Sequence, residues 1–225
     1  MSEIPRLAGL VDAYFEEALG LRDAALEGAL RRSAEAGLPA IHVSACQGKL
    51  LELLALSVGA RSILEVGTLG GFSTIFLARA ARANGGRVLS LELKEAHATV
   101  ARMNLADAGL ADVAEVRTGP ALESLKALGT ADGAPFDFVF IDADKPTTAE
   151  YFDRALELSR PGALIIVDNV AREGAVADAT SADPSVQGIR RFVEQLRGNS
   201  RVAATAIQTI GAKSHDGFAL VRVMA

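Results

Sequence analysis

Apolar runs alternate with amphipathic stretches from residue 62 to residue 196. The runs are typical of parallel strands covered on both faces; they are 62–66, 87–91, 136–141 and 163–167, with a shorter one at 113–117. The stretches between and after them carry apolar residues at helical spacing; they are 72–83, 96–108, 121–128, 148–158 and 184–196. Strands and helices in alternation predict right-handed βαβ units and a doubly wound α/β sheet.

Residues 7–36 precede the first predicted strand and read as two amphipathic helices, which Gly37 and Pro39 terminate. They lie outside any central sheet, so they cover the core, form a lid or provide an arm for dimer contact. We therefore divide the chain into a helical arm at 1–40 and a main domain at 41–225.

Helix and strand signals also fill the rest of the main domain. Ser44 is a suitable N-cap, with Gln47 at the capping-box position, for a helix that ends at Gly59. Residues 170–183 are small and polar and predict a loop beside the fifth strand. Two final strands are expected at 202–207 and 218–223.

Composition narrows the class of protein. The chain has 225 residues, of which 50% are hydrophobic, enough for one domain with a substantial core. A net charge of −5 disfavours a nucleic-acid partner. The single cysteine, Cys46, excludes an intrachain disulfide and favours a reducing, cytoplasmic location. We see no signal peptide and no apolar stretch of the roughly 18 residues that a membrane span needs.

A glycine-rich turn follows the first strand of the alternating region. The strand ends at Glu65-Val66 and leads into Gly67-Thr68-Leu69-Gly70-Gly71. A pyrophosphate fingerprint needs a glycine where Leu69 stands, and no Walker lysine follows. Glu65 would repel phosphate but could accept from an ammonium, which favours a cationic, phosphate-free ligand such as S-adenosylmethionine. The alternative is a structural turn that binds no ligand.

Glu92 ends the second strand about 20 residues beyond the glycines, where nucleotide-binding sheets hydrogen-bond ribose hydroxyls. An ordinary exposed acid at a strand end is the alternative. Together with Glu65, Gly67 and Gly71, Glu92 predicts a site of adenosine type.

Oxygen-bearing side chains follow the fourth and fifth strands. Asp142 ends one, and Asp168-Asn169 ends the other, so parallel strands would bring all three to the same sheet edge. Such a set suits a hard divalent ion, Mg²⁺, Mn²⁺ or Ca²⁺, rather than zinc. Lys145, desolvated near a metal, could serve as a general base. The alternatives are solubilising acids and a surface ion pair of Lys145 with Asp144 or Glu150.

The histidines contribute less to the predicted site. His97 falls in the middle of a helix, on a face expected to meet solvent, and we interpret it as structural. His42 and His215 flank predicted site loops and stay open as substrate contacts. Cys46 is expected to be a small buried residue.

Four stretches, 44–49, 63–73, 138–145 and 161–170, carry a resemblance that extends over roughly residues 38–224. In them the chain resembles the metal-dependent O-methyltransferase family that includes catechol and caffeoyl-CoA O-methyltransferases and bacterial relatives. The resemblance implies a Rossmann-like sheet of seven strands with the last antiparallel to the rest. It also implies a homodimer that methylates a small phenolic substrate.

The same resemblance assigns residues. The methyl donor, S-adenosylmethionine, would contact Val43, Glu65, Gly67, Thr68, Gly71, Ser73, Glu92, Pro120, Ala121 and Asp142. Pro120 is a departure, since the family usually has a small polar or acidic residue there. The metal, with Mg²⁺ first and Mn²⁺ or Ca²⁺ next, would be held by Asp142, Asp168 and Asn169. Lys145 matches the proposed base, and Asp142 would serve both donor and metal.

A phenol has a pKa of roughly 10, so a divalent ion bound to two adjacent hydroxyls would acidify and position the acceptor. The expected acceptor is therefore a catechol-like vicinal diphenol. Ile210 stands where mammalian catechol enzymes have a carboxylate, so the metal alone is expected to bind the second hydroxyl. The plant relatives bind coenzyme A through basic and aromatic residues, whereas 170–183 contains Arg172 but no aromatic residue, so a coenzyme A ester is not expected. The alternatives are a metal-independent small-molecule methyltransferase and a non-catalytic protein that binds S-adenosylmethionine.

Overall fold

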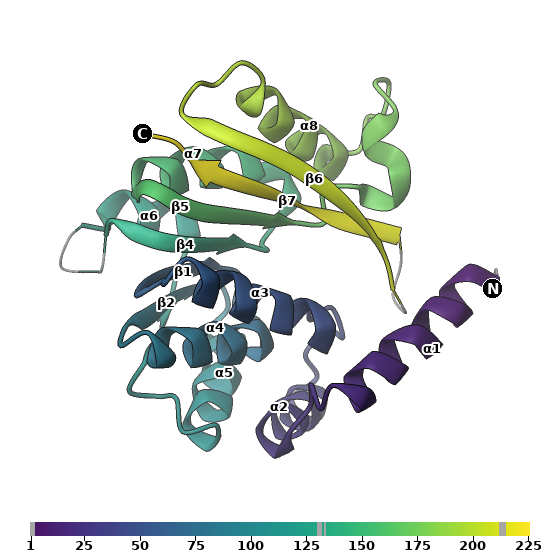
Figure 1. The fold of residues 1–225 in the computed structure, drawn as a ribbon, viewed down its shortest axis with the longest axis vertical. Helices are drawn as coiled ribbons and strands as arrows, with labels where there is room; N and C mark the ends of the chain where they lie inside the picture. The colour runs from purple at the N-terminus through teal and green to yellow at the C-terminus, as the bar shows by residue number, and fades with distance from the viewer. Residues whose placement is uncertain (1–2, 130–131, 133, 212–214) are drawn as a thin grey trace.

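The computed structural model, which describes residues 3–129, 132, 134–211 and 215–225, is built on a seven-stranded sheet (Figure 1). The strand order is β3-β2-β1-β4-β5-β7-β6. Strands β1 to β5 are parallel, and β7 is antiparallel to both of its neighbours. The strands are β1 (Ser62–Val66), β2 (Arg87–Glu92), β3 (Ala114–Thr118), β4 (Phe136–Ile141), β5 (Ser159–Asp168), β6 (Val202–Ile210) and β7 (His215–Val223). The doubly wound sheet with an antiparallel last strand is confirmed.

The α-helices of the structure are α1 (Glu3–Ala18), α2 (Ala24–Glu35), α3 (Ala45–Ser57), α4 (Phe72–Ala83), α5 (Glu95–Asp107), α6 (Ala121–Ala127), α7 (Thr148–Glu157) and α8 (Pro184–Leu196). Short 3₁₀ turns, η2 (Lys145–Thr147) and η3 (Arg172–Ala177), lie before α7 and within the predicted 170–183 loop. The final hairpin is longer than predicted, because β6 and β7 stay paired as far as Ile210 and His215. Backbone pairing continues there without burial, so no apolar pattern marks it.

Each face of the sheet is covered by its own hydrophobic core. On one face, α2, α3, α4 and α5 pack on side chains such as Ile63 and Phe138, and on the other α6, α7 and α8 pack on Leu64 and Val139. Successive residues of β1 and β4 therefore point into opposite cores, as the pleat of a strand requires. Burial on both faces explains why these strands read as continuous apolar runs.

Parallel pairing brings the functional strand ends together. Val66 of β1 pairs with Leu91 of β2 and with Ile141 of β4, and Ile141 pairs with Val167 of β5. The residues that follow these strands lie at one edge of the sheet, where ligands of such folds bind. The backbone N–H of Asp142 donates to the Val66 carbonyl at 2.8 Å, which ties the two central strand ends to each other.

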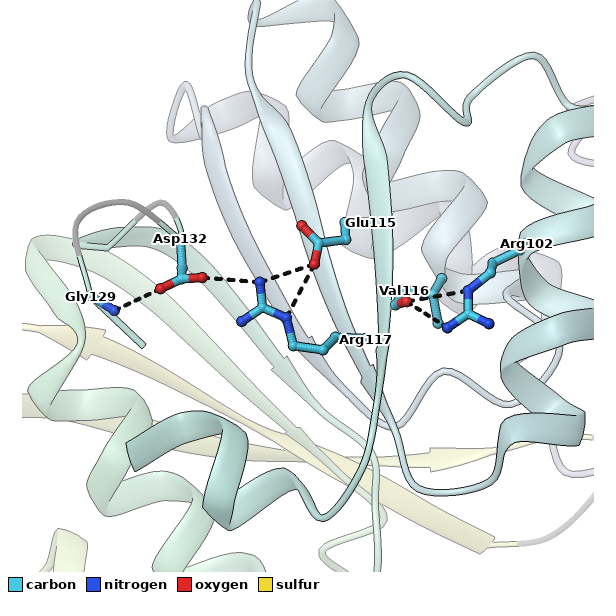
Figure 2. A network of polar contacts seen from close by, with 6 residues as sticks. All are labelled: Arg102, Glu115, Val116, Arg117, Gly129 and Asp132. Carbon is cyan, nitrogen blue, oxygen red and sulfur yellow. Dashed lines mark hydrogen bonds and ion pairs between the residues drawn. The ribbon is translucent and has the colours of Figure 1, made fainter. Parts of the chain in front are cut away.

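The outer edge of the sheet, at β3, is protected by arginines (Figure 2). The Arg102 guanidinium donates to the Val116 carbonyl at 2.9 and 3.3 Å. Arg117 donates to Glu115 and, at 3.0 Å, to Asp132, which in turn accepts from the Gly129 N–H. The Arg102 contact occupies a backbone carbonyl of the edge strand, and the other contacts place charged side chains along it, which disfavours pairing with another chain.

The two N-terminal helices are positioned differently. Leu26 and Ala29 of α2 are buried in the main core, whereas α1 stands away from the sheet (Figure 1). Arg32 of α2 donates to the Asn104 side chain at 2.5 Å, and Asn104 donates to the Gly70 carbonyl at 2.8 Å. Helix α2 is thus connected to the glycine turn. Within the described ranges, no helix is long and apolar enough to cross a membrane.

Two helical glycines give a test of this packing. A Cβ added at Gly188 of α8 would lie 2.0 Å from the Lys145 carbonyl oxygen, whereas one at Gly28 of α2 would meet only the end of Arg31, at 3.8 Å. We expect Gly188→Ala to lower the free energy of unfolding by about 2–3 kcal/mol through overpacking. Gly28→Ala should raise it by about 0.5–1 kcal/mol through helix propensity. Urea unfolding of both variants checks this, and effects of equal sign would contradict it.

Candidate active site

The glycine turn brings β1 and the end of β4 into direct backbone contact. Gly67 has a φ of +101°, and a Cβ there would lie 2.1 Å from the carbonyl oxygen of Asp142. Gly71, with a φ of +79°, caps the N-terminus of α4. Only glycine fits this backbone conformation and close approach at position 67. The turn therefore lies directly against the loop that carries Asp142.

A pocket of about 790 Å³ opens at this edge of the sheet. Its size is within the range of small-molecule sites. Most of the residues singled out from the sequence line it: Val43, Gly67, Thr68, Ser73, Glu92, Pro120, Ala121, Asp142, Lys145 and Asn169. Gly71, Glu65 and Asp168 are not among its lining residues. The structure therefore brings both predicted constellations to a single pocket.

Glu65 lies behind the pocket wall. Its carboxylate is fully buried and accepts hydrogen bonds from Ser73 at 2.6 Å, from Ser90 at 2.5 Å and from Thr74. Burial raises the pKa of Glu65 to about 7, although the three hydroxyls lower it in part. The sequence predicted that Glu65 contacts a ligand ammonium; in the structure it fixes Ser73, which does line the pocket.

Glu92 is held by the backbone. One carboxylate oxygen accepts from the N–H of Thr68 at 3.2 Å and of Leu69 at 2.8 Å, and the other accepts from the N–H of Lys94 at 3.0 Å. Leu69 has a φ of +50°, which turns its N–H toward this acid. The predicted ribose acceptor is therefore fixed in place on the pocket wall.

His97 corrects the sequence interpretation. It was expected on a solvent face, but its side chain is only 15% exposed and lines the pocket beside Glu92, with Nδ1 at 3.5 Å from the carboxylate. Helix α5 has a weak periodicity, so its phase could not be read from apolar positions. His42 also lines the pocket, against the ring of Phe72, whereas His215 pairs with Gln208 away from it.

Lys145 pairs with Asp142, not with the partners weighed from the sequence. Its Nζ lies 2.9 Å from Oδ1 of Asp142, and its side chain is 10% exposed. Residue 145 begins η2, which turns the lysine back toward the end of β4. Asp144 instead accepts from Tyr151 at 2.6 Å and from Thr147.

Asp168 and Asn169 complete the cluster. Burial and the negative charge of Asp142 raise the pKa of Asp168 to about 7, against the opposing charge of Lys145. Asn169 has a φ of +58°, a conformation that persists only where its surroundings require it. Its N–H donates to Asp168 at 2.9 Å. The side chain of Gln47 also hydrogen-bonds Asp168, so it does not close the predicted capping box, and sequence reasoning missed this contact.

The chemistry of this donor set fits a hard divalent cation. Two carboxylates and a carboxamide supply only oxygen ligands, and two acids that disfavour each other's charge are stabilised by a bound cation. Among the residues that the structure describes, no group of three or more His, Cys, Asp and Glu side chains could hold a metal ion. The third ligand would therefore have to be Asn169, as the sequence predicted.

The N-terminal segment contributes to the pocket in a way that sequence reasoning missed. Apolar side chains from α2 and the connection that follows it lie along the wall; they include Leu30, Ala34, Leu38, Pro39 and Ile41. The division at residue 40 placed all of these except Ile41 outside the main domain. Because they lie beside the glycine turn, the pocket is apolar on that side and acidic on the other.

The buried acid of β1 gives a pH test. The ordinary pKa of Glu65 is 4.5, and its pKa in the folded protein is about 7. At pH values between these two, folded Glu65 holds a proton that the unfolded chain releases. Its contribution to stability is therefore present at low pH and is lost as pH rises through this window. Relative to Glu65→Gln, the wild-type free energy of unfolding should fall by on the order of 3 kcal/mol from pH 4.5 to 8. Chemical denaturation of both proteins checks this, and a difference that stays constant or rises would refute it.

Comparisons with known proteins agree with this site. A model of the O-methyltransferase family matches residues 20–224. A catechol O-methyltransferase of Niastella koreensis and another of Mycobacterium tuberculosis are each 51% identical to this chain over 213 residues. The alignments cover 95% of this chain and 96% and 94% of those two proteins.

Solved structures agree with the fold and with the methyl donor. An O-methyltransferase from Bacillus cereus in complex with SAH is 53% identical, with a TM-score of 0.94 over 97% of this chain and 99% of that one. An O-methyltransferase from Streptomyces achromogenes in complex with SAM is 49% identical, with a TM-score of 0.94 over 100% of both chains. The chain therefore belongs to the O-methyltransferase family and depends on S-adenosylmethionine for methyl transfer.

Proposed function

We propose that this enzyme transfers the methyl group of S-adenosylmethionine to a hydroxyl of a small, catechol-like vicinal diphenol. The observation that carries the proposal is the cluster of Asp142, Lys145, Asp168 and Asn169 directly beside the glycine turn. The two relatives at 51% identity, both catechol O-methyltransferases, support the same acceptor class.

The donor half of the pocket is proposed on Val43, Gly67, Thr68, Ser73, Glu92, Pro120, Ala121 and Asp142. Ser73, fixed by the Glu65 carboxylate, offers a hydroxyl to the methionine end of the donor. Glu92 faces the ribose end, and Pro120 and Ala121 provide apolar contact for the base. Gly71 and Glu65 act from behind the wall, by shaping the turn and by holding Ser73.

The acceptor half would hold a divalent ion, Mg²⁺ first and Mn²⁺ or Ca²⁺ as alternatives, on Asp142, Asp168 and Asn169. Such an ion lowers the pKa of a coordinated hydroxyl and orients it. The chain's own contribution is to fix these ligands: Asp168 is held by the Asn169 N–H and by Gln47, and Asp142 by its N–H to β1. Lys145, whose Nζ lies 2.9 Å from Oδ1 of Asp142, is the general base that we propose for the proton that the hydroxyl loses.

Besides activation of the hydroxyl, holding the two reactants close together accelerates methyl transfer. Reacting atoms must be held about 3–3.5 Å apart and in line for the methyl to pass between oxygen and sulfur. The backbone contact of Gly67 with Asp142 sets the spacing between the two halves of the pocket. Half-buried apolar side chains such as Leu30 and Leu38 lie at the wall and would limit the access of water to the reaction.

Removal of the metal tests the mechanism. With catechol and labelled S-adenosylmethionine, we expect methyl transfer that needs Mg²⁺ and is abolished by excess EDTA. Asp168→Ala should lower kcat at least about 100-fold while leaving the Kd for S-adenosylhomocysteine unchanged, because Asp168 does not line the donor half. Phenol, with a single hydroxyl, should be a far poorer acceptor than catechol.

The same assay separates the alternatives. Full activity in excess EDTA would replace the metal mechanism by that of a metal-independent methyltransferase. Donor binding without turnover on any vicinal diphenol would identify a non-catalytic relative. Ser200→Ala, at an exposed position outside the pocket, is the matched control and should behave as wild type in every arm.

We also propose that the enzyme is a homodimer through α1 and the edge strand β6. Large apolar side chains of α1 and of the residue that follows it are exposed; they are Leu7, Leu10, Val11, Tyr14 and Phe15, and then Leu19. Ile207 and Ile210 of β6 are exposed as well. A monomeric protein rarely exposes an apolar stripe as long as that of residues 7–19 together with an unpaired strand edge. A second copy would offer the same stripe and edge, so both would be covered by one self-complementary interface.

Oligomeric state is measured by light scattering after size exclusion. The wild type should have twice the 23.4 kDa mass of the chain. The double substitution Leu10→Glu and Tyr14→Glu should give the monomer, because it puts two charges into the apolar stripe. Ala111→Glu, in the exposed turn before β3, introduces a glutamate outside the stripe and is the control, which should stay dimeric. A monomeric wild type would refute the proposal.

A further inference from the structure

His97, which the sequence pattern indicates to be structural, stands beside Glu92 on the pocket wall. We propose that His97 binds one of the two ribose hydroxyls of the methyl donor, while Glu92 binds the other. The inference rests on the proposed placement of the donor, with its ribose at Glu92.

The hydrogen-bonding capacity of Glu92 limits what it can hold alone. A carboxylate oxygen accepts about two hydrogen bonds. Oε2 already accepts from the N–H groups of Thr68 and Leu69. Oε1 accepts from the N–H of Lys94 and has one lone pair left. Glu92 can therefore accept from one hydroxyl of a ribose, and the neighbouring hydroxyl needs a second partner.

His97 is placed to be that partner. Its Nδ1 lies 3.5 Å from Oε1 of Glu92, which is too long for a good hydrogen bond, so neither group uses up the other's capacity. The imidazole projects from the first turn of α5 onto the same wall. In its neutral form it offers one donor and one acceptor, which matches a hydroxyl in either sense.

The pair also selects the kind of ribose. Two adjacent, unmodified hydroxyls match the acceptor of Glu92 and the imidazole of His97, which can donate or accept. A phosphate on either hydroxyl would meet the Glu92 carboxylate and be repelled. The geometry therefore suits an adenosine with an unmodified ribose, as in S-adenosylmethionine.

Calorimetric binding of three ligands tests the inference: S-adenosylhomocysteine and its 2′-deoxy and 3′-deoxy analogues. We expect His97→Ala to lower the affinity for S-adenosylhomocysteine by about 5- to 10-fold, which corresponds to the loss of one hydrogen bond. The analogue that lacks the hydroxyl held by His97 should bind wild type and variant within twofold. The other analogue should still lose about 5- to 10-fold on substitution.

Controls keep the outcomes distinct. His215→Ala, which removes a histidine away from the pocket, should bind all three ligands as wild type does. His97→Leu keeps the bulk of the side chain and serves if the alanine variant unfolds. If His97 substitution changes affinity by less than twofold, or by the same factor for all three ligands, the inference is wrong. If Glu92→Gln leaves affinity unchanged, the placement of the ribose itself is wrong.

Discussion

The site depends on the approach of the Gly67 backbone to the carbonyl of Asp142. A side chain at position 67 would put a Cβ at 2.1 Å from that oxygen. Next to this contact, the paired strands β1 and β4 end, and the Asp142 N–H donates to the Val66 carbonyl. In the function that we propose, it fixes the distance between the glycine turn, which would face the methyl donor, and the cluster of Asp142, Asp168 and Asn169, which would face the acceptor. Methyl transfer requires the reacting atoms to be held close together and in line. This backbone contact is therefore its main structural requirement.

A buried polar chain behind the pocket keeps the donor side rigid. Glu65 accepts from Ser73 and Ser90, Ser90 contacts the hydroxyl of Thr68 at 2.6 Å, and the Thr68 N–H donates to Glu92. Each buried polar group has its partner, so the chain stabilises a single arrangement rather than a set of alternatives. Two acids that the sequence read as ligand contacts thus differ in role: one faces the pocket, and one supports its wall.

Strand order, strand ends and the glycine turn could be predicted from the sequence, because strands buried on both faces leave continuous apolar runs that end at polar residues. For that reason the sequence predicts that Asp142, Asp168 and Asn169 lie at the same edge of the sheet. The phase of α5 could not be predicted, since its apolar pattern is weak, and His97 was misplaced for that reason. Gln47 was assigned to a cap because its partner, Asp168, lies far along the chain, and contacts of that range leave no local signal.

We propose that one pocket holds the donor on the glycine turn and a metal-bound acceptor beside it. Crystals grown with S-adenosylhomocysteine, catechol and Mn²⁺, with data collected at the manganese absorption edge, test it directly. We expect one anomalous peak between Asp142, Asp168 and Asn169, with a catechol oxygen facing the sulfur of S-adenosylhomocysteine over Gly67. A metal peak elsewhere, or a catechol that binds with its oxygens turned away from the sulfur, would contradict it.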